Sequence, residues 1–273
     1  MQYFYEIMGL TWLAKSPIQL DSILIANSVI QANSKITELY KFNYLDSWCA
    51  AVADGTKGIH DVYSNTSAAV LENVNIQWMN RSTVEIDFNK IQQGLSQKKP
   101  NSLMFLGSVS TLALVTNTTR KGHLRIQHLG DSRVYGFSQI DQTWQCLTTD
   151  HTLLGEFSDL LKPKENEEYP KVFSRLTGSF RAFTGFDTFE KDQLLAKYGQ
   201  AQNHQMSTYD ALLICTKGVH EVLRNSKFWL PFSKDVTHKE WLMGMKQKLI
   251  KYGANDNASM LLIRLNVEHR QIS

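Results

Sequence analysis

Three aspartates stand at the ends of apolar segments, and their carboxylates are the groups of this chain best placed to bind an ion or support a reaction. Asp54 and Asp131 each follow an apolar run typical of a buried strand, and Asp256 comes just before another. Carboxylates at strand ends can converge on one cleft, and oxygen clusters of this kind bind hard cations such as Mg²⁺ or Mn²⁺. Asp-Gly and Asp-Asn are also common turn sequences, so the spacing alone leaves a structural interpretation open.

Helices that could position these residues are predicted by capping signals. Ser82 and Glu85 have the spacing of a capping box, and apolar residues follow at helical spacing. The same box recurs at Thr237 and Glu240, before a second amphipathic segment that we expect Gly253 to end. A third helix is expected over about 59–79.

Short segments rich in β-forming residues lie between the helices. They predict strands at Trp48–Ala53, Leu112–Thr116, Leu124–Leu129, Val134–Phe137, Leu212–Thr216 and Met260–Leu265. The segment up to Lys15 predicts a first strand, and Thr119–Gly122 predicts a hairpin turn. Strands that come in groups, rather than alternating with helices, favour an α+β fold with antiparallel sheets.

Composition indicates a folded chain that we expect to form one domain over residues 1–273. Hydrophobic residues make up 42% and charged residues 20%, which argues against a disordered chain. The net charge of +3 is too small to indicate nucleic acid or an anionic membrane as a partner. The segment Gly155–Met206 is polar and weakly periodic, and it is expected to be either a flap over a site or a long surface excursion.

The compartment is suggested by the cysteines and by the absence of long apolar runs. Cys49, Cys146 and Cys215 have no Cys-x-x-Cys spacing, so we expect three buried free thiols in a reducing compartment. No apolar run approaches the ~18–20 residues of a membrane helix. Together these features predict a soluble cytoplasmic protein.

Five short blocks, in order along the chain, carry a resemblance to a known family. The blocks are Ala53–Gly58, Gly107–Thr111, Leu129–Tyr135, Leu147–His151 and Asn255–Ala258. Together they resemble the metal-dependent protein phosphatases, which are the phosphatase 2C family of serine/threonine phosphatases, and particularly its compact bacterial members. The resemblance runs from about residue 9 to residue 266. It implies a four-layer α-β-β-α sandwich of two antiparallel sheets flanked by helices, with a metal cluster at one edge.

The resemblance also implies roles for single residues. In that family two divalent ions, Mn²⁺ or Mg²⁺, share one aspartate and activate a water that attacks phosphorus. Asp54 matches the shared ligand, Gly55 a carbonyl ligand and Asp256 a ligand of the second ion, which makes Asp54 and Asp256 the catalytic candidates. Asp131 matches the residue that supports a third ion, and Asp21 matches one that holds metal-bound water.

Several positions depart from the family's pattern. Lys217 stands where the family has a metal-ligating carboxylate. An ammonium cannot ligate a cation, but it could pair with Asp54 and Asp256 as a covalently attached substitute for the missing ion. Lys15 is adjacent to the position of the family's phosphate-binding arginine, and it is our candidate for contact with a substrate phosphate. Leu20 replaces the acidic or amide residue that usually precedes the N-terminal aspartate.

Two functions follow as hypotheses. The first is a pseudophosphatase, which binds a phosphorylated protein, a cognate kinase or a regulatory partner with little or no hydrolysis, and which need not bind a metal. The second is a divergent serine/threonine phosphatase that uses Mn²⁺ or Mg²⁺ around Asp54, Gly55, Asp131 and Asp256. Lys217 is the residue that distinguishes these hypotheses, because its charge opposes a metal ion.

Overall fold

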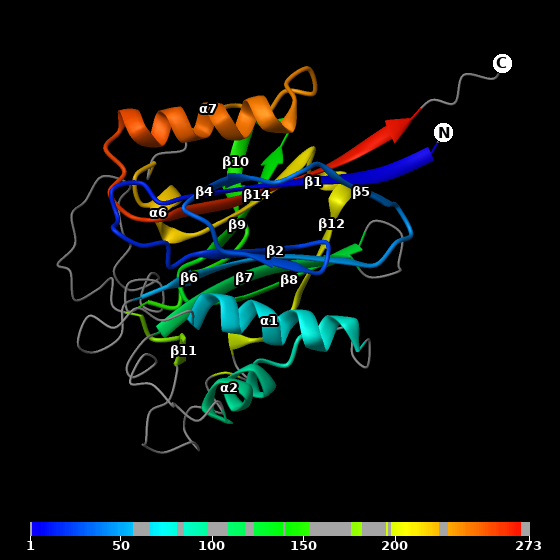
Figure 1. Cartoon of the computed structure of the whole chain (residues 1–273). Helices are drawn as coiled ribbons and strands as arrows, with labels where there is room; N and C mark the ends of the chain where they lie inside the picture. Colours follow the sequence, from blue (N-terminus) through cyan, green and yellow to red (C-terminus); the bar gives the residue numbers. More distant parts are fainter. Residues whose placement is uncertain are drawn as a thin grey trace, which may run out of the picture.

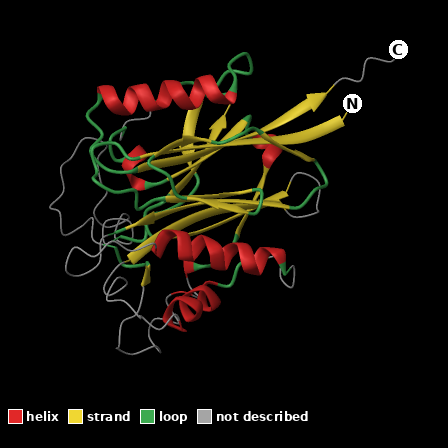
Figure 2. Ribbon diagram, in the orientation of Figure 1, coloured by secondary structure: helices red, strands yellow, loops and turns green. Residues whose placement is uncertain are grey.

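Two antiparallel sheets stacked face to face form the centre of the molecule, with helices on their outer faces (Figure 1). The computed structural model describes residues 2–56, 66–80, 85–97, 109–117, 123–138, 140–152, 176–181, 195, 198–223 and 229–268. Figure 2 shows the helices confined to the two outer layers and the strands to the two inner ones, apart from short turns between them. The α+β class and the four-layer sandwich are therefore as expected.

The first sheet has the strand order β10-β9-β13-β14-β1-β4, and β5 also pairs with β1. Its strands are β1 (Gln2–Trp12), β4 (Ser34–Ile36), β5 (Tyr40–Asn43), β9 (Arg133–Ser138), β10 (Thr143–Cys146), β13 (Ala211–Cys215) and β14 (Ala258–Glu268). The longest pairing joins the first and last strands of the chain, from Gln2 with Glu268 to Trp12 with Ala258.

The second sheet has the order β12-β8-β7-β6-β2-β3, and β11 also pairs with β7. Its strands are β2 (Ser22–Ile25), β3 (Ser28–Ile30), β6 (Trp48–Gly55), β7 (Val109–Asn117), β8 (His123–Leu129), β11 (Phe180–Arg181) and β12 (Gln202–Gln205). All six predicted internal strands are present. The expected hairpin joins β7 and β8, although its turn at 118–122 lies outside the described residues.

The described helices are α1 (Thr66–Met79), α2 (Phe88–Gln97), the single turn α6 (Lys217–His220), the 3₁₀ turn η4 (Met206–Thr208) and α7 (His238–Lys251). Helix α7 covers the first sheet, whereas α1 and α2 cover the second (Figure 1). None of the described helices has both the length and the apolar character that crossing a bilayer requires.

Three buried clusters hold the layers together. Trp241 and Met245 of α7 belong to a cluster with residues on the outer face of β13 and β14. A second cluster fills the space between the sheets, and it includes the fully buried Val52 of β6. A third joins α1 and α2, through Val70 and Ile91, to the outer face of the second sheet. Each strand of the centre is therefore buried on both faces, which explains why their sequences are continuous apolar runs.

Helix boundaries confirm one of the two predicted capping boxes. Thr237 and Glu240 bond reciprocally at the start of α7, and Gly253 follows its end with φ of 80°. The predicted start of α2 was wrong, because the helix begins at Phe88. The Asp87 carboxylate caps it by accepting hydrogen bonds from the backbone N–H groups of Asn89 and Lys90, at 3.0 and 3.3 Å. Ser82 lies outside the described residues.

Some further expectations are met only in part. Residues 57–65 of the third predicted helix lie outside the described residues, and α1 begins at Thr66. Cys49 and Cys215 are buried free thiols as predicted, but Cys146 is exposed, because it ends the edge strand β10. Within Gly155–Met206, the described parts are built into the second sheet as β11 and β12, and the buried Phe180 anchors the first of these. A role for the rest of this segment as a flap stays a prediction.

Candidate functional site

The predicted acidic residues lie at one end of the sandwich because their strands end there. Asp54 and Gly55 are the last two residues of β6, and Asp21 immediately precedes β2, which pairs with β6 through Ser22 and Ala53. Asp131 lies in the turn where the chain passes from β8 in the second sheet to β9 in the first. Asp256 precedes β14, so both sheets contribute carboxylates to this end.

Asp21 is the most enclosed of these carboxylates. Its side chain is fully buried, and the Thr216 hydroxyl donates a 2.7 Å hydrogen bond to its Oδ2. Its Oδ1 is buried and has no hydrogen-bond partner among the described residues. Burial, together with the charge of Asp256, raises the pKa of Asp21 to about 7, although the Thr216 hydrogen bond opposes the shift.

Asp54 is half-buried and lies within electrostatic reach of the other three carboxylates. Burial raises its pKa well above the usual value, and the negative charges of Asp21, Asp131 and Asp256 raise it further. The Lys217 ammonium acts in the opposite direction. The structure therefore brings the four predicted aspartates and Lys217 to the same end of the sandwich.

Lys217 forms its ion pair with Asp131, which corrects the expectation that it would pair with Asp54 and Asp256. The Lys217 Nζ lies 3.2 Å from Asp131 Oδ2, and the two side chains are 31% and 5% exposed. Burial alone would lower the pKa of Lys217, but the charges of Asp131 and Glu221, together with the contact to Asp131, outweigh burial and raise that pKa. Lys217 begins α6 directly after β13, and β13 pairs with β9, so the lysine faces the turn that carries Asp131.

Two glycines allow the backbone to close around this site. A Cβ at Gly55 would lie 2.6 Å from the Leu20 carbonyl oxygen, so only glycine lets the end of β6 approach the segment before Asp21. A Cβ at Gly218 would lie 1.8 Å from the Asn257 carbonyl oxygen. Gly218 therefore permits α6, and with it Lys217, to lie against the turn that holds Asp256.

Three residues that support the site were missed by sequence reasoning. The Gln19 Oε1 accepts a 3.0 Å hydrogen bond from the Asp21 backbone N–H, so the expected amide is present one position earlier than Leu20. Thr216 holds the Asp21 carboxylate, and the His220 ring lies 2.7 Å from the Asp131 carbonyl. Burial lowers the pKa of His220 to about 3, so its neutral Nε2–H donates to that carbonyl. Only Gln19 had a sequence signal, as an amide displaced by one residue.

Other polar residues near the site have structural roles. His128 is buried and bonds the Thr149 carbonyl at 2.7 Å, as expected of a core histidine. His151 Nδ1 accepts from the Gly130 N–H at 3.1 Å, and its ring stacks on His128 with centroids 4.4 Å apart. Lys15 is exposed in the turn after β1, and no described acidic partner holds it. Its contact with a substrate phosphate stays a prediction.

Comparison with solved structures identifies the fold. The chain superposes on an S. agalactiae serine/threonine phosphatase with a TM-score of 0.68 and 17% identity, covering 95% of this chain and 99% of that one. The serine/threonine phosphatase Stp1 from Staphylococcus aureus gives 0.68 and 14%, covering 96% and 95%. The catalytic domain of the serine/threonine protein phosphatase PstP, in complex with two manganese ions, gives 0.59 and 16%, covering 98% and 100%.

These likenesses extend over nearly the whole chain, so the molecule has the fold of the bacterial phosphatase 2C-type serine/threonine phosphatases. No protein-family model matches the chain, and no curated protein matches it. The low identity leaves the activity to be argued from the site itself.

Proposed function

We propose that this chain is a pseudophosphatase, which uses the phosphatase 2C fold to bind a phosphorylated protein or a regulatory partner with little or no hydrolysis. The observation that carries the proposal is the ion pair between Lys217 and Asp131 at the acidic end of the sandwich. A protonated amine supplies one positive charge where the fold's enzymes are expected to hold a divalent cation.

The described residues do not fit a pair of divalent ions. Among them, no group of three or more His, Cys, Asp or Glu side chains is arranged to hold a metal. Asp131 is already neutralised by Lys217, and a divalent ion beside that ammonium would be repelled, since unit charges 4 Å apart interact by about 4 kcal/mol even at intermediate dielectric. Hard cations need several oxygen ligands. With Asp131 paired to the Lys217 ammonium, too few carboxylate oxygens remain to hold two such ions.

The second candidate is the divergent serine/threonine phosphatase, and one specific observation favours it. The buried Oδ1 of Asp21 has no partner among the described residues, and the pKa of Asp54 is raised by the charges around it. A single Mn²⁺ or Mg²⁺ held by Asp54, the Gly55 carbonyl and Asp256 would offset the repulsion among these carboxylates. Such an ion would supply a polarised water, and the chain's own residues would position it.

A manganese-dependent assay separates the two candidates. The wild-type chain, Lys217→Asp and Asp54→Asn are each given a small phosphomonoester and a phosphothreonine peptide. We expect wild-type turnover no higher than that of Asp54→Asn, and tighter Mn²⁺ binding in Lys217→Asp by calorimetry. Manganese-dependent wild-type turnover that Asp54→Asn abolishes would refute the proposal and establish the second candidate.

A matched charge reversal controls for general electrostatics. Lys234 also forms an ion pair, 3.4 Å from Asp210, but its side chain is 61% exposed. Lys234→Asp changes the net charge by the same amount as Lys217→Asp, and it should leave Mn²⁺ affinity unchanged.

Binding of a phosphopeptide, compared with its unphosphorylated form, should weaken in Lys15→Glu if Lys15 contacts the phosphate.

A further inference from the structure

A cavity of about 270 Å³ lies at the opposite end of β6 from the acidic site. Its lining residues are Ala26, Asn27, Phe42, Ser47, Trp48, Cys49, Trp78 and Met79. Trp48 begins β6 and Asp54 comes near its end, so the strand's rise of about 3.3 Å per residue separates the two regions by roughly 20 Å. The cavity is therefore independent of the acidic site and of the function proposed for it.

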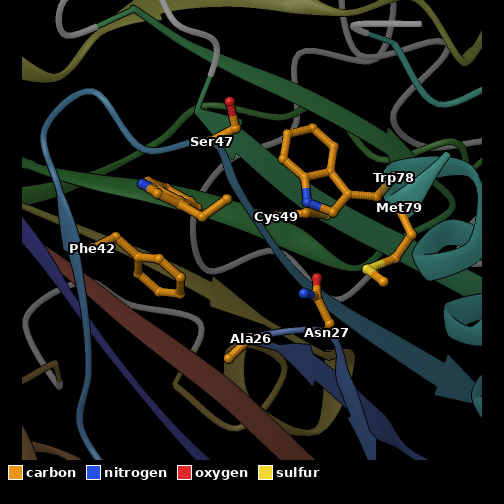
Figure 3. Close-up of a pocket in the computed structure, with 8 residues that line it drawn as sticks. Ala26, Asn27, Phe42, Ser47, Cys49, Trp78 and Met79 are labelled. Carbon is orange, nitrogen blue, oxygen red and sulfur yellow. The ribbon is translucent and has the colours of Figure 1, made fainter. Parts of the chain in front are cut away.

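The walls of this cavity are apolar and aromatic, and none of the lining residues carries a charge. Figure 3 shows the Trp78 indole and the Met79 side chain extending from the end of α1 toward Ser47 and Cys49 at the start of β6, with Phe42 on the other side. Asn27 is exposed and Ser47 partly exposed, so these two residues place polar groups where the cavity meets solvent.

A two-residue hairpin turn forms one side of the cavity. Ala26 and Asn27 form the two-residue turn between β2 and β3, and both have positive φ, at 49° and 61°. Positive φ at both central residues is what a two-residue hairpin turn requires, although alanine there has a steric cost that glycine would avoid. The Asn75 side chain of α1 donates a 3.0 Å hydrogen bond to the Asn27 carbonyl, which fixes the turn to the helix.

Two buried residues of β6 also line the cavity. Trp48 is 1% exposed and packs edge-on against Tyr5, with ring centroids 5.1 Å apart. Burial raises the pKa of the Cys49 thiol to about 12, so this thiol is a neutral, unreactive surface. A preformed, largely apolar cavity with a few polar groups at its opening is the usual form of a small-molecule site.

Large, solvent-exposed hydrophobic side chains lie in the same helix and loop as the residues that line the cavity. Met79 is 57% exposed, Ile76 lies one turn earlier on α1 at 58%, and Leu45 lies in the same loop as Ser47 at 60%. Ile76 and Met79 are three residues apart, so they share a face of the helix. Of these three, Met79 lines the cavity itself, so its exposed side chain extends the apolar lining toward solvent.

We propose that this cavity binds a neutral, mostly apolar small molecule with two aromatic ring systems. The indole and phenyl walls favour a planar ring system, since aromatic pairs attract beyond their buried area. The uncharged lining disfavours an ionised ligand, because nothing in it would compensate for the ligand's lost hydration. A single polar group on the ligand would meet Asn27 or Ser47.

Two fluorophores with the same ring skeleton test this proposal directly. N-phenyl-naphthylamine is neutral, and anilinonaphthalene sulfonate adds one negative charge to nearly the same rings. We expect saturable fluorescence enhancement with the neutral compound, and a Kd about tenfold or more lower than that of the anion. Equal affinity for the two compounds, or no saturable binding of the neutral one, would overturn the proposal.

Variants locate the binding. Trp78→Ala and Met79→Ala should each weaken binding of the neutral compound, the first by about tenfold and the second several-fold. Met79 is 57% exposed, so its variant is expected to fold even if the Trp78 variant does not. Ile140→Ala is the matched control, since Ile140 is 94% exposed and does not line the cavity. Unchanged binding in Met79→Ala, or an equal loss in Ile140→Ala, would place the compound elsewhere and refute the site.

Discussion

Lys217 gives the acidic end of the sandwich a cation that cannot dissociate. Its ammonium is 3.2 Å from Asp131, and it also lowers the pKa of Asp54 against the effect of the surrounding carboxylates. The lysine is only partly exposed, whereas Asp131 is buried. Loss of the lysine would therefore leave a buried carboxylate without its counter-charge, which is the costly way to break an ion pair.

The first prediction measures that cost. Lys217→Met should lower the free energy of unfolding by about 1–3 kcal/mol, below the ~3–5 kcal/mol of a fully buried pair because solvent screens the lysine. Denaturant unfolding near neutral pH provides the measurement. Lys234→Met should change stability little, and adding Asp131→Asn to Lys217→Met should recover part of the loss. A Lys217→Met protein as stable as wild type would mean that the pair contributes nothing.

A second prediction concerns the hydroxyl that holds Asp21. Thr216→Val removes the donor to the buried Oδ2 while keeping the side chain's shape, and it should cost about 1–3 kcal/mol, as expected when a buried acceptor loses its hydrogen bond. Thr216→Ser keeps the hydroxyl and should lose clearly less. If denaturant unfolding gives the same loss for both variants, the Thr216 methyl group stabilises the fold as much as the hydrogen bond does, contrary to the prediction.

At the scale of elements, α2 and α7 differ in the residues that cap their N-termini. Helix α2 is capped by Asp87, whereas α7 is capped by the Thr237 and Glu240 box. Immediately after that cap, His238 is buried against β1, where its Nδ1 lies 3.8 Å from Glu6 Oε2. The two helix starts therefore make different, separately testable contributions to stability.

The cap of α2 can be identified by substitution. Asp87→Ala removes the acceptor for the Asn89 and Lys90 N–H groups, and it should lower the free energy of unfolding by about 0.5–2 kcal/mol. Ser82→Ala should have less effect, because α2 begins well after it, at Phe88. A larger loss for Ser82→Ala would show that the capping box predicted from sequence acts in solution.

The start of α7 predicts a pH dependence. Burial lowers the pKa of His238 below its usual 6.5, against the attraction of Glu6 and with the repulsion of Arg264. The unfolded chain therefore binds this proton first, so the stability from a neutral His238 is complete above about pH 6.5 and is lost as the pH falls. His238→Asn should lose less stability than wild type between about pH 8 and pH 5. Parallel pH profiles for the two proteins would contradict this.

At the scale of the whole molecule, three buried clusters link four layers, and the chain's first and last strands pair in the middle of one sheet. Parts of Gly155–Met206 join this architecture, because Phe180 and Met206 are at most 1% exposed. A segment that was expected to lie over or beside the molecule thus contributes to its core.

Amide exchange tests this arrangement. Peptides that contain Phe180 or Met206 should exchange slowly, at rates close to those of β7 and β8, because exchange there requires opening of the second sheet. For the remainder of Gly155–Met206 we retain the expectation of fast exchange. Fast exchange at Phe180 and Met206 as well would show that the whole segment opens independently of the sandwich.

Local patterns in the chain were enough to predict the central strands, one helix cap and the end of the sandwich at which the carboxylates meet. Apolar runs such as Trp48–Ala53 are long enough to be recognised locally, and Asp54 must lie at the end of the strand it follows. The five ordered blocks indicated the phosphatase 2C fold, which the structural comparisons show. These features depend on neighbours in the chain, and for that reason they can be predicted without a structure.

The partners of these residues became known only from the folded molecule. Lys217 pairs with Asp131 rather than with Asp54 and Asp256, because β13 lies beside β9 and faces the turn between the sheets. The contact of Gln19 with Asp21 and the cavity at the start of β6 likewise depend on how separate segments meet. Short edge strands such as β3 and β12 gain their structure from the neighbouring strand. Such contacts join residues far apart in the chain, and their energies are set by packing and burial that no local pattern records.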